Sequence, residues 1–421
     1  MKSHLFIISK IILLLLVSSL PAKDKEPRKK RGQRYSIEQA VSDRAQLHTI
    51  AFSGVAFLTG EFGASTFIPP GKVCDYFGFQ YMRDIDAAQK GHNPMFLNRV
   101  VGNVLHILNP DQKQLFEDLA EEQAPELEKL ARMRLPLIKA FHLEAERQEP
   151  GLSQKVVTEY VGGIFELDAA LSIRRAEVMA EVYRSLTDEQ KTYLSKMKFG
   201  DFDTWPDIDE RGKKRKENKR GKSKLLNVAY MTYASEFFSW TAGNVEADVY
   251  FCPERHGTYF GGFYMKDMPA MGKRDYDIST SITGESGRHF VENILNPEQA
   301  KRITSILDKQ RNAIMGTIEL RREIAIELRK FLKNETPDTL KILDLGKQYG
   351  ELDGYMSWLY AMAFAEVNRT LTKDQREALT KLRDLSGYDC APYYIYSRGR
   401  EDALHLKNVE STFFMSEDNQ A

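Results

Sequence analysis

The chain of 421 residues contains only three cysteines, and it lacks the short motifs of the common enzyme classes. Three cysteines without a CxxC or CxxCH pair exclude a disulfide-rich scaffold, a cysteine-based zinc site and an attached haem. The sequence has no glycine-rich phosphate loop, no GxSxG and no HExxH, and its eight histidines are scattered. Because no group of residues has a pattern typical of catalysis, we expect a protein that is not an enzyme.

Net charge is absent as well, but the balance of 60 basic and 60 acidic residues hides two basic segments. Residues 23–34 carry seven bases and two acids, and residues 211–224 carry nine bases and one acid, which leaves the rest of the chain acidic. Neither segment has aromatic residues among its bases, so nucleic-acid binding is not expected. We interpret residues 23–34 and 207–224 as solvated basic linkers.

The N-terminus has the order of a secretory signal. Lys2 and Lys10 precede an apolar run at residues 11–17, and small residues follow up to Ala22. The run is shorter than the roughly 20 residues that a membrane span needs. We therefore expect residues 1–22 to be a cleaved signal peptide and the protein to be periplasmic or otherwise exported, and soluble after cleavage. The alternative is an uncleaved N-terminal membrane anchor, because the bases that follow oppose translocation.

A sequence of five residues occurs four times and divides the chain into two similar halves. The four pentads are Leu108-Asn109-Pro110-Asp111-Gln112, Leu186-Thr187-Asp188-Glu189-Gln190, Leu295-Asn296-Pro297-Glu298-Gln299 and Leu371-Thr372-Lys373-Asp374-Gln375. The first matches the third and the second matches the fourth, with nearly the same separation along the chain in both cases. Since flanking residues recur at the same separation, we predict two tandem homologous units, residues 35–206 and 225–402, followed by a polar tail at 403–421.

Each pentad has the pattern of a capping box at the start of a helix. The Thr or Asn side chain accepts from a free backbone amide, and the Gln three residues later reaches back to the cap. Apolar residues then recur with helical spacing, from Leu115 to Phe141 and from Ile303 to Phe331. We predict an all-α fold of two long antiparallel helical hairpins, each preceded by an irregular segment rich in glycine and aromatic residues. The helices after the first and third pentads are expected to exceed about 30 residues.

Two such pentads per unit, on amphipathic helices behind a secretory signal, resemble the LTXXQ-motif family of periplasmic proteins typified by Spy and CpxP. Members of that family are small helical hairpins that dimerise into a curved cradle and act as ATP-independent chaperones or as modulators of envelope and metal stress. The resemblance implies that each unit matches one family protomer and that the chain is an intramolecular pseudo-dimer. It also implies that unfolded or partner proteins are what the chain binds.

One cluster in the second unit has the composition of a copper site. Its members are Cys252, His256, Met265, Met268 and Met271. Thioether, thiolate and imidazole ligands together suit Cu(I), and such sites occur in exported proteins. The alternative is that the methionines are core residues that fill gaps.

The cysteines allow one disulfide. Cys74 and Cys252 occupy similar positions in the two units, so an oxidising compartment permits a bond between them, which leaves Cys390 free. The alternative is three buried thiols, which spacing alone does not exclude.

Two pairs of carboxylates also recur. Glu166 and Asp168 correspond to Glu351 and Asp353, at the same separation as the second and fourth pentads. They are candidates for paired catalytic carboxylates, but a pair on one helix is more often a solvated face or a hydrogen bond between helices. We favour one of these structural roles.

Aromatic residues crowd the glycine-containing segment of each unit. They offer an apolar groove for a partner, with Phe77, Tyr81, Phe260 and Tyr264 as the candidate binding residues. The alternative, which we favour, is that most of these large rings complete the core at the open end of a hairpin.

The leading interpretation is an exported, non-enzymatic, ATP-independent chaperone-like or partner-binding protein of the cell envelope, without a cofactor. One alternative is a periplasmic copper-binding protein that responds to metal stress. A second alternative is a structural component of envelope assembly.

Overall fold

The computed structural model describes residues 37–59, 76, 95–197, 205–206, 208, 224–250, 289–382 and 411–415. All of them belong to one compact unit, Tyr35–Ala421. The fold is all-α, as predicted: every regular element in these ranges is a helix, and the one β-type pairing is an isolated bridge between Leu152 and Met415. Within the same ranges no helix has the length and apolar character required to cross a membrane.

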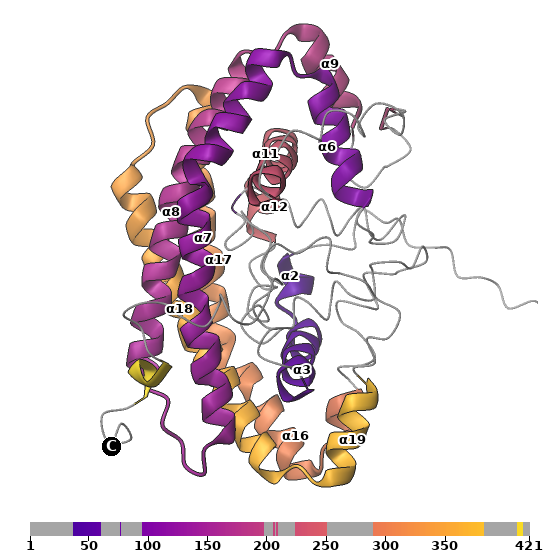
Figure 1. Ribbon diagram of the computed structural model, residues 1–421, viewed down its shortest axis with the longest axis vertical. Coiled ribbons are helices and arrows are strands. Elements are labelled where there is room, and N and C mark those ends of the chain that lie inside the picture. The colour runs from indigo at the N-terminus through magenta and orange to yellow at the C-terminus, as the bar shows by residue number, and fades with distance from the viewer. Residues whose placement is uncertain are drawn as a thin grey trace, which may run out of the picture. The chain divides into compact units, whose positions relative to one another are not determined.

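The helices follow one another with mostly short connections where the chain is described. In chain order they are α2 (Ile37–Ala40), α3 (Asp43–Thr59), α6 (Met95–Ile107), α7 (Pro110–Glu146), α8 (Gln154–Arg184), α9 (Asp188–Lys196), α11 (Lys224–Ala242), α12 (Val245–Tyr250), the π-helical turn η5 (Phe290–Ile294), α16 (Pro297–Thr304), α17 (Ile306–Arg329), the 3-10 turn η6 (Phe331–Lys333), α18 (Thr339–Thr370), α19 (Lys373–Leu382) and the 3-10 turn η9 (Ser411–Phe414) (Figure 1).

The helix after the first pentad has the predicted length, but the helix after the third does not. α7 runs unbroken for 37 residues in spite of Pro125 and Pro136. The corresponding segment of the second unit is interrupted, since α16 ends at Thr304 and α17 begins at Ile306. At the break, the hydroxyl of Ser305 donates to the carbonyl of Arg302 at 2.9 Å. Hydroxyl groups that bond nearby carbonyls compete with the helical ladder, and the apolar periodicity does not reveal this.

α8 and α18 pack against each other and run antiparallel. Gly346 of α18 lies close to Phe165 and Ala169 of α8, whereas Gly354, two turns later, lies close to Thr158. Positions therefore rise along one helix as they fall along the other. The glycines allow the two backbones to approach, because any side chain there would stand between the helices.

Gly350 occupies the tightest part of this contact. A methyl group on it would lie 2.6 Å from the Cβ of Phe165 and 2.6 Å from the carbonyl oxygen of Val161. Because one of these atoms is backbone, the helices would have to separate, and we expect Gly350→Ala to lower the free energy of unfolding by about 2–3 kcal/mol. Urea unfolding at neutral pH measures the change.

Gly163 of α8 is the matched control. A methyl group there would meet nothing within 4 Å. Gly163→Ala should therefore raise the free energy of unfolding by about 0.5–1 kcal/mol through helix propensity alone. If Gly350→Ala were as harmless as Gly163→Ala, the close approach of α8 and α18 would be wrong.

The first long helix of each predicted unit packs on the other unit. α3, from the first, contacts η5, α16, α17, α18 and α19 of the second, and α11, from the second, contacts α6, α7, α8 and α9 of the first (Figure 1). Both are deeply buried, as shown by Ile50 and Val55 of α3 and by Phe237 and Trp240 of α11. This exchange means that each hairpin completes its core with a helix from the other half of the chain.

Arginines at corresponding positions also join the two units. Arg184, at the end of α8, donates to the carbonyl of Phe331 in the α17–α18 turn at 2.9 Å. Arg369, its counterpart at the end of α18, donates to the carbonyl of Arg147 in the α7–α8 turn at 2.6 Å and to the carboxylate of Glu144 at 2.8 Å. Each long helix therefore supports the turn of the opposite hairpin.

Candidate functional site

All four pentads form capping boxes. Asn109 and Gln112 exchange two hydrogen bonds of 2.9 Å between side chain and backbone at the start of α7. The same reciprocal pair occurs at the other three helix starts, between Thr187 and Gln190, between Asn296 and Gln299, and between Thr372 and Gln375. Each box satisfies two backbone amides that the first turn leaves without partners.

The two pentads of the first unit are also bonded to each other. The amide of Gln190 donates to the side-chain oxygen of Gln112 at 2.8 Å, and Gln112 donates back at 3.3 Å. Gln112 further donates to the carbonyl of Ser185 at 3.1 Å, and Gln190 donates to the carbonyl of Ile107 at 2.6 Å. We call this arrangement a glutamine clasp: it joins the start of α7 to the start of α9.

A second glutamine clasp repeats the first in the second unit. Gln375 donates to Gln299 at 2.7 Å and receives a bond of 3.2 Å in return. The outer acceptors are the carbonyls of Thr370 and Ile294, the counterparts of the two outer acceptors in the first clasp. The leucines that open the pentads, Leu108, Leu186, Leu295 and Leu371, are all buried.

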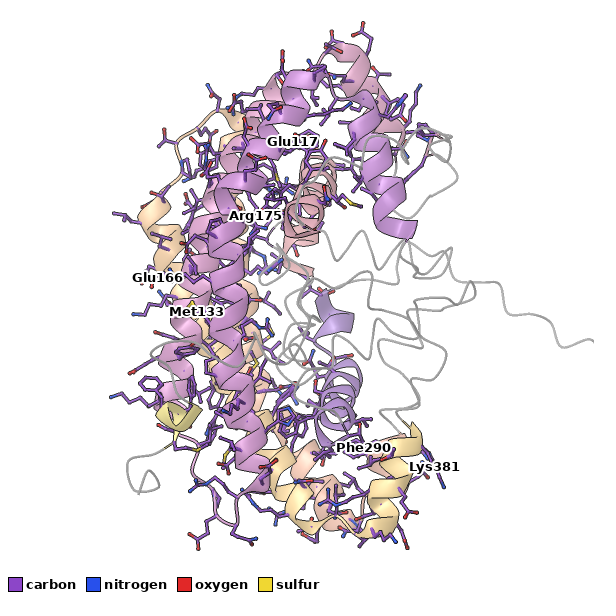
Figure 2. All side chains as sticks on the ribbon, in the orientation of Figure 1. Glu117, Met133, Glu166, Arg175, Phe290 and Lys381 are labelled. Atoms are coloured by element: carbon purple, nitrogen blue, oxygen red, sulfur yellow. The ribbon has the colours of Figure 1, made fainter. Side chains whose placement is uncertain are left out.

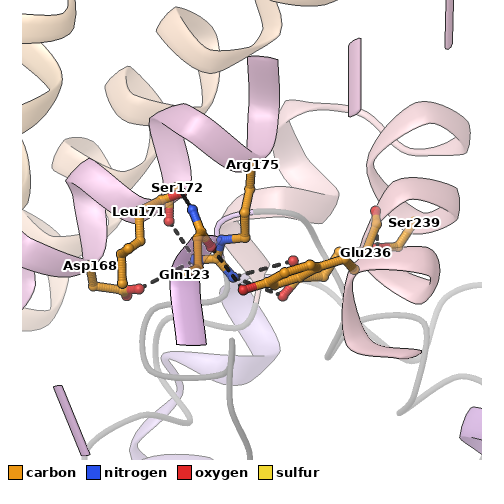
Figure 3. Close-up of polar contacts among 8 residues, drawn as sticks. Gln123, Asp168, Leu171, Ser172, Arg175, Glu236 and Ser239 are labelled. Carbon is orange, nitrogen blue, oxygen red and sulfur yellow. Dashed lines mark hydrogen bonds and ion pairs between the residues drawn. The ribbon is translucent and has the colours of Figure 1, made fainter. Parts of the chain in front are cut away.

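A buried charged network lies where α7, α8 and α11 meet (Figure 3). The guanidinium of Arg175 donates to both carboxylate oxygens of Glu236 at 3.2 and 3.3 Å, to Asp168 at 3.3 Å and to the hydroxyl of Ser172 at 2.7 Å. The side chains of Arg175 and Glu236 are 0% exposed. One cation that faces two carboxylates away from water depends on such bonds for its stability.

Neutral groups extend this network across the three helices. The ring of Tyr233 lies under the guanidinium of Arg175, 5.7 Å from the carbon at its centre. The hydroxyl of Tyr233 donates to Gln123 of α7 at 2.8 Å, and Gln123 donates to the carbonyl of Leu171 at 2.9 Å (Figure 3). Side chains from α7, α8 and α11 are thus tied into one group.

The described residues hold one copy of this network. The position that corresponds to Arg175 in the second unit is Tyr360. The hydroxyl of Thr59 on α3 donates to the carbonyl of Val55, just as Thr241 on α11 donates to the carbonyl of Phe237. When the two helices are aligned on these bonds, Gly54 corresponds to Glu236. The matched helices therefore differ at the two residues that form the buried ion contact.

The recurrent carboxylates have different environments. Asp168 and Asp353 are each 1% exposed, whereas Glu166 is on the surface. Figure 2 shows Glu166 at the outer edge of the bundle and Arg175 beside α11. For the two aspartates, an interpretation as a solvated face is wrong. Asp168 instead binds Arg175 of its own helix, which in turn binds α11.

Sequence reasoning missed Arg175, Glu236, Tyr233 and Gln123. A usable signal was present, because Glu236 is the one acidic residue of α11 and lies among apolar and uncharged hydroxyl residues. A lone charge on a helix that is apolar on every side is expected to have a buried partner.

Several sequence-based candidates lie outside the described residues. They are the partner-binding aromatics Phe77, Tyr81, Phe260 and Tyr264, the copper candidates Cys252, His256, Met265, Met268 and Met271, and the disulfide candidate Cys74. Where the chain is described, no group of three or more His, Cys, Asp or Glu residues is arranged to hold a metal ion.

The described aromatic residues of the two glycine-containing segments lie in the core, which agrees with the favoured interpretation for these residues. Phe57, Tyr76, Phe238 and Trp240 are at most 4% exposed. Tyr76 packs against the ring of Tyr349 with centroids 6.3 Å apart.

His142 of α7 adds a pH-sensitive group next to α3. Its ring lies 4.5 Å from the ring of Phe57, and burial lowers the pKa of His142 to about 4 from 6.5. The unfolded chain therefore binds the proton first as the pH falls. The stabilisation is complete above pH 6.5 and is lost towards pH 4.

We expect the free energy of unfolding to fall by about 2 kcal/mol between neutral pH and pH 4. This is less than the full shift of the His142 pKa would give, because the ring is only partly buried. His142→Leu should remove this pH dependence. Free energies of unfolding measured at several pH values for both proteins give the two slopes, and parallel curves would contradict the assignment to His142.

No protein-family model matches this chain, and neither does any curated protein or solved structure.

Proposed function

We propose that this chain is an exported protein that binds apolar helices of unfolded or partner proteins without ATP, as a holdase does. The observation that carries the proposal is the seating of α3 and α11. Each hairpin holds an apolar helix that comes from a distant part of the chain. Since burial of apolar surface is not directional, a surface that accepts one such helix is suited to others of similar shape.

The pentads give the second line of support. They resemble those of the LTXXQ-motif family, and in this chain they build rigid ends for the hairpins through the capping boxes and the glutamine clasps. A rigid frame lowers the entropy cost of holding a helical segment.

The test is an aggregation assay with the chain that starts at residue 23. A chemically unfolded client enzyme is diluted into buffer with a molar excess of the protein, with and without ATP, and light scattering is recorded. We expect suppression that does not depend on ATP and that an equal mass of serum albumin does not reproduce. Unchanged scattering at excess protein would contradict the proposal.

A further inference from the structure

α3 and α11 occupy corresponding places, but they are held by different chemistry. α11 is anchored by the buried contact between Glu236 and Arg175, and Arg329 of α17 donates to the carbonyl of Trp240 near its end at 3.0 Å. Breaking a buried charge contact is strongly unfavourable. α11 is therefore expected to stay in place.

Among the described side chains, the ion pair that joins α3 to α17 is exposed to solvent. Asp43 meets Arg311 of α17 at 2.8 Å, with side chains that are 61% and 49% exposed. Solvent screens such ion pairs, so they contribute little to stability. One turn later, Gln46 accepts a bond of 3.2 Å from Gln310.

Where the side chains are described, apolar groups of α3 also pack closely on the second unit. A methyl group on Gly54 would lie 3.0 Å from the ring of Phe364 and 3.1 Å from the ring of Phe290. The rings of Phe57 and Phe364 have centroids 5.9 Å apart. Contacts of this kind favour any helix with the same small and large residues in the same places.

We propose that the surface under α3 is where this protein takes up an apolar helix of a partner, and that α3 fills it until the partner arrives. We call this surface the α3 seat: the faces of η5, α16, α17, α18 and α19 that α3 contacts. The inference rests on the proposed function and adds that α3, and not α11, is the helix that leaves its place. α3 leaves because its charged contact is exposed, whereas α11 stays because its charged contact is buried.

The seat also defines the chemistry of its occupant. Asp43, Gln46, Gly54 and Phe57 are spaced by three, eight and three positions, which places them on one face of a helix. A partner helix therefore carries an acidic residue in its first turn to meet Arg311. Three turns later it carries a glycine between Phe290 and Phe364, and an aromatic residue follows.

The direct test uses Gly54→Leu, which crowds the rings of Phe290 and Phe364 and should displace α3 while leaving the seat unchanged. The probe is a fluorescein-labelled peptide with the sequence of residues 37–59. We expect the Gly54→Leu protein to bind it at least 10-fold more tightly than the unmodified protein does. Gly163→Leu is the control, because that position has open space around it. Equal affinity in all three proteins would overturn the proposal.

Hydrogen exchange on the unmodified protein gives an independent measurement that needs no folded variant. Amides of α3, such as those of Ile50 and Val55, should exchange at least 10-fold faster than those of Phe237 and Trp240 in α11. Equal or slower exchange in α3 would overturn the proposal, even if Gly54→Leu failed to fold.

A locked protein separates this proposal from the proposed function. Asp43→Cys and Arg311→Cys, at two positions exposed to solvent, are joined by a short bismaleimide after Cys74, Cys252 and Cys390 have been replaced by serine. Loss of client suppression on locking supports the α3 seat, and undiminished suppression overturns the seat while the proposed function stands. If the unlocked protein never suppresses aggregation, the proposed function fails and peptide binding still decides the seat.

Discussion

Replacing Arg175 with methionine is expected to lower the free energy of unfolding by about 3–5 kcal/mol. The substitution leaves Asp168 and Glu236 as buried carboxylates that have lost the cation between them. Glu236→Leu should cost less, because Arg175 then keeps its contacts with Asp168 and Ser172. Denaturant unfolding of both variants measures this order of effects.

Arg174 provides the control for the same substitution one residue earlier. Its side chain is 44% exposed and pairs with Glu122 and Glu177 on the surface. Arg174→Met should therefore change the free energy of unfolding by no more than about 0.5–1 kcal/mol. Equal effects at Arg174 and Arg175 would show that the buried network is not what holds α11 on α7 and α8.

Changing Gln112 to glutamate is expected to cost about 3 kcal/mol, although the capping box itself accepts either residue. Glutamate keeps the bond to the backbone amide of Asn109. It loses the amide that donates to Ser185 and Gln190, and it places a buried carboxylate against their oxygens. The change is thus specific to the glutamine clasp.

Two further variants test whether the effect of Gln112→Glu comes from the glutamine clasp. Gln299→Glu makes the same change in the second clasp and should cost a similar amount, because its bonds to Thr370 and Gln375 are the same in kind. Gln114→Glu, on the exposed side of α7, should change stability by no more than about 0.5 kcal/mol. If thermal and urea unfolding showed that Gln112→Glu destabilises the protein no more than Gln114→Glu does, the glutamines would serve only as caps.

The starts of the four helices at the pentads were predictable from the sequence because capping is local. The residues of each box lie three positions apart, so Asn109 and Gln112 reveal the start of α7 without knowledge of anything else in the fold. The all-α class followed from the same signals and from the apolar spacing. The break at Ser305 was missed, since a serine inside an amphipathic pattern does not alter its period.

The candidate site was predictable only in part. The pentads were recognised as caps, but their bonds to one another join residues 78 and 76 positions apart, and nothing local predicts them. Arg175 and Glu236 are 61 positions apart on helices from different units. Their pairing depends on the exchange of α3 and α11, which sequence repeats do not reveal.

The amino-acid sequence by itself therefore determined where the four helices at the pentads begin, that the helices after the first and third pentads are amphipathic, and that the chain repeats its pentads at a nearly constant separation. Only the tertiary structure shows the bonds between glutamines that glutamate could not make. It also shows which helix completes which hairpin and which charges are buried. The physical reason is range. Caps and periodicity act within a few residues, whereas the clasps and the Arg175 network exist only after distant helices have packed together.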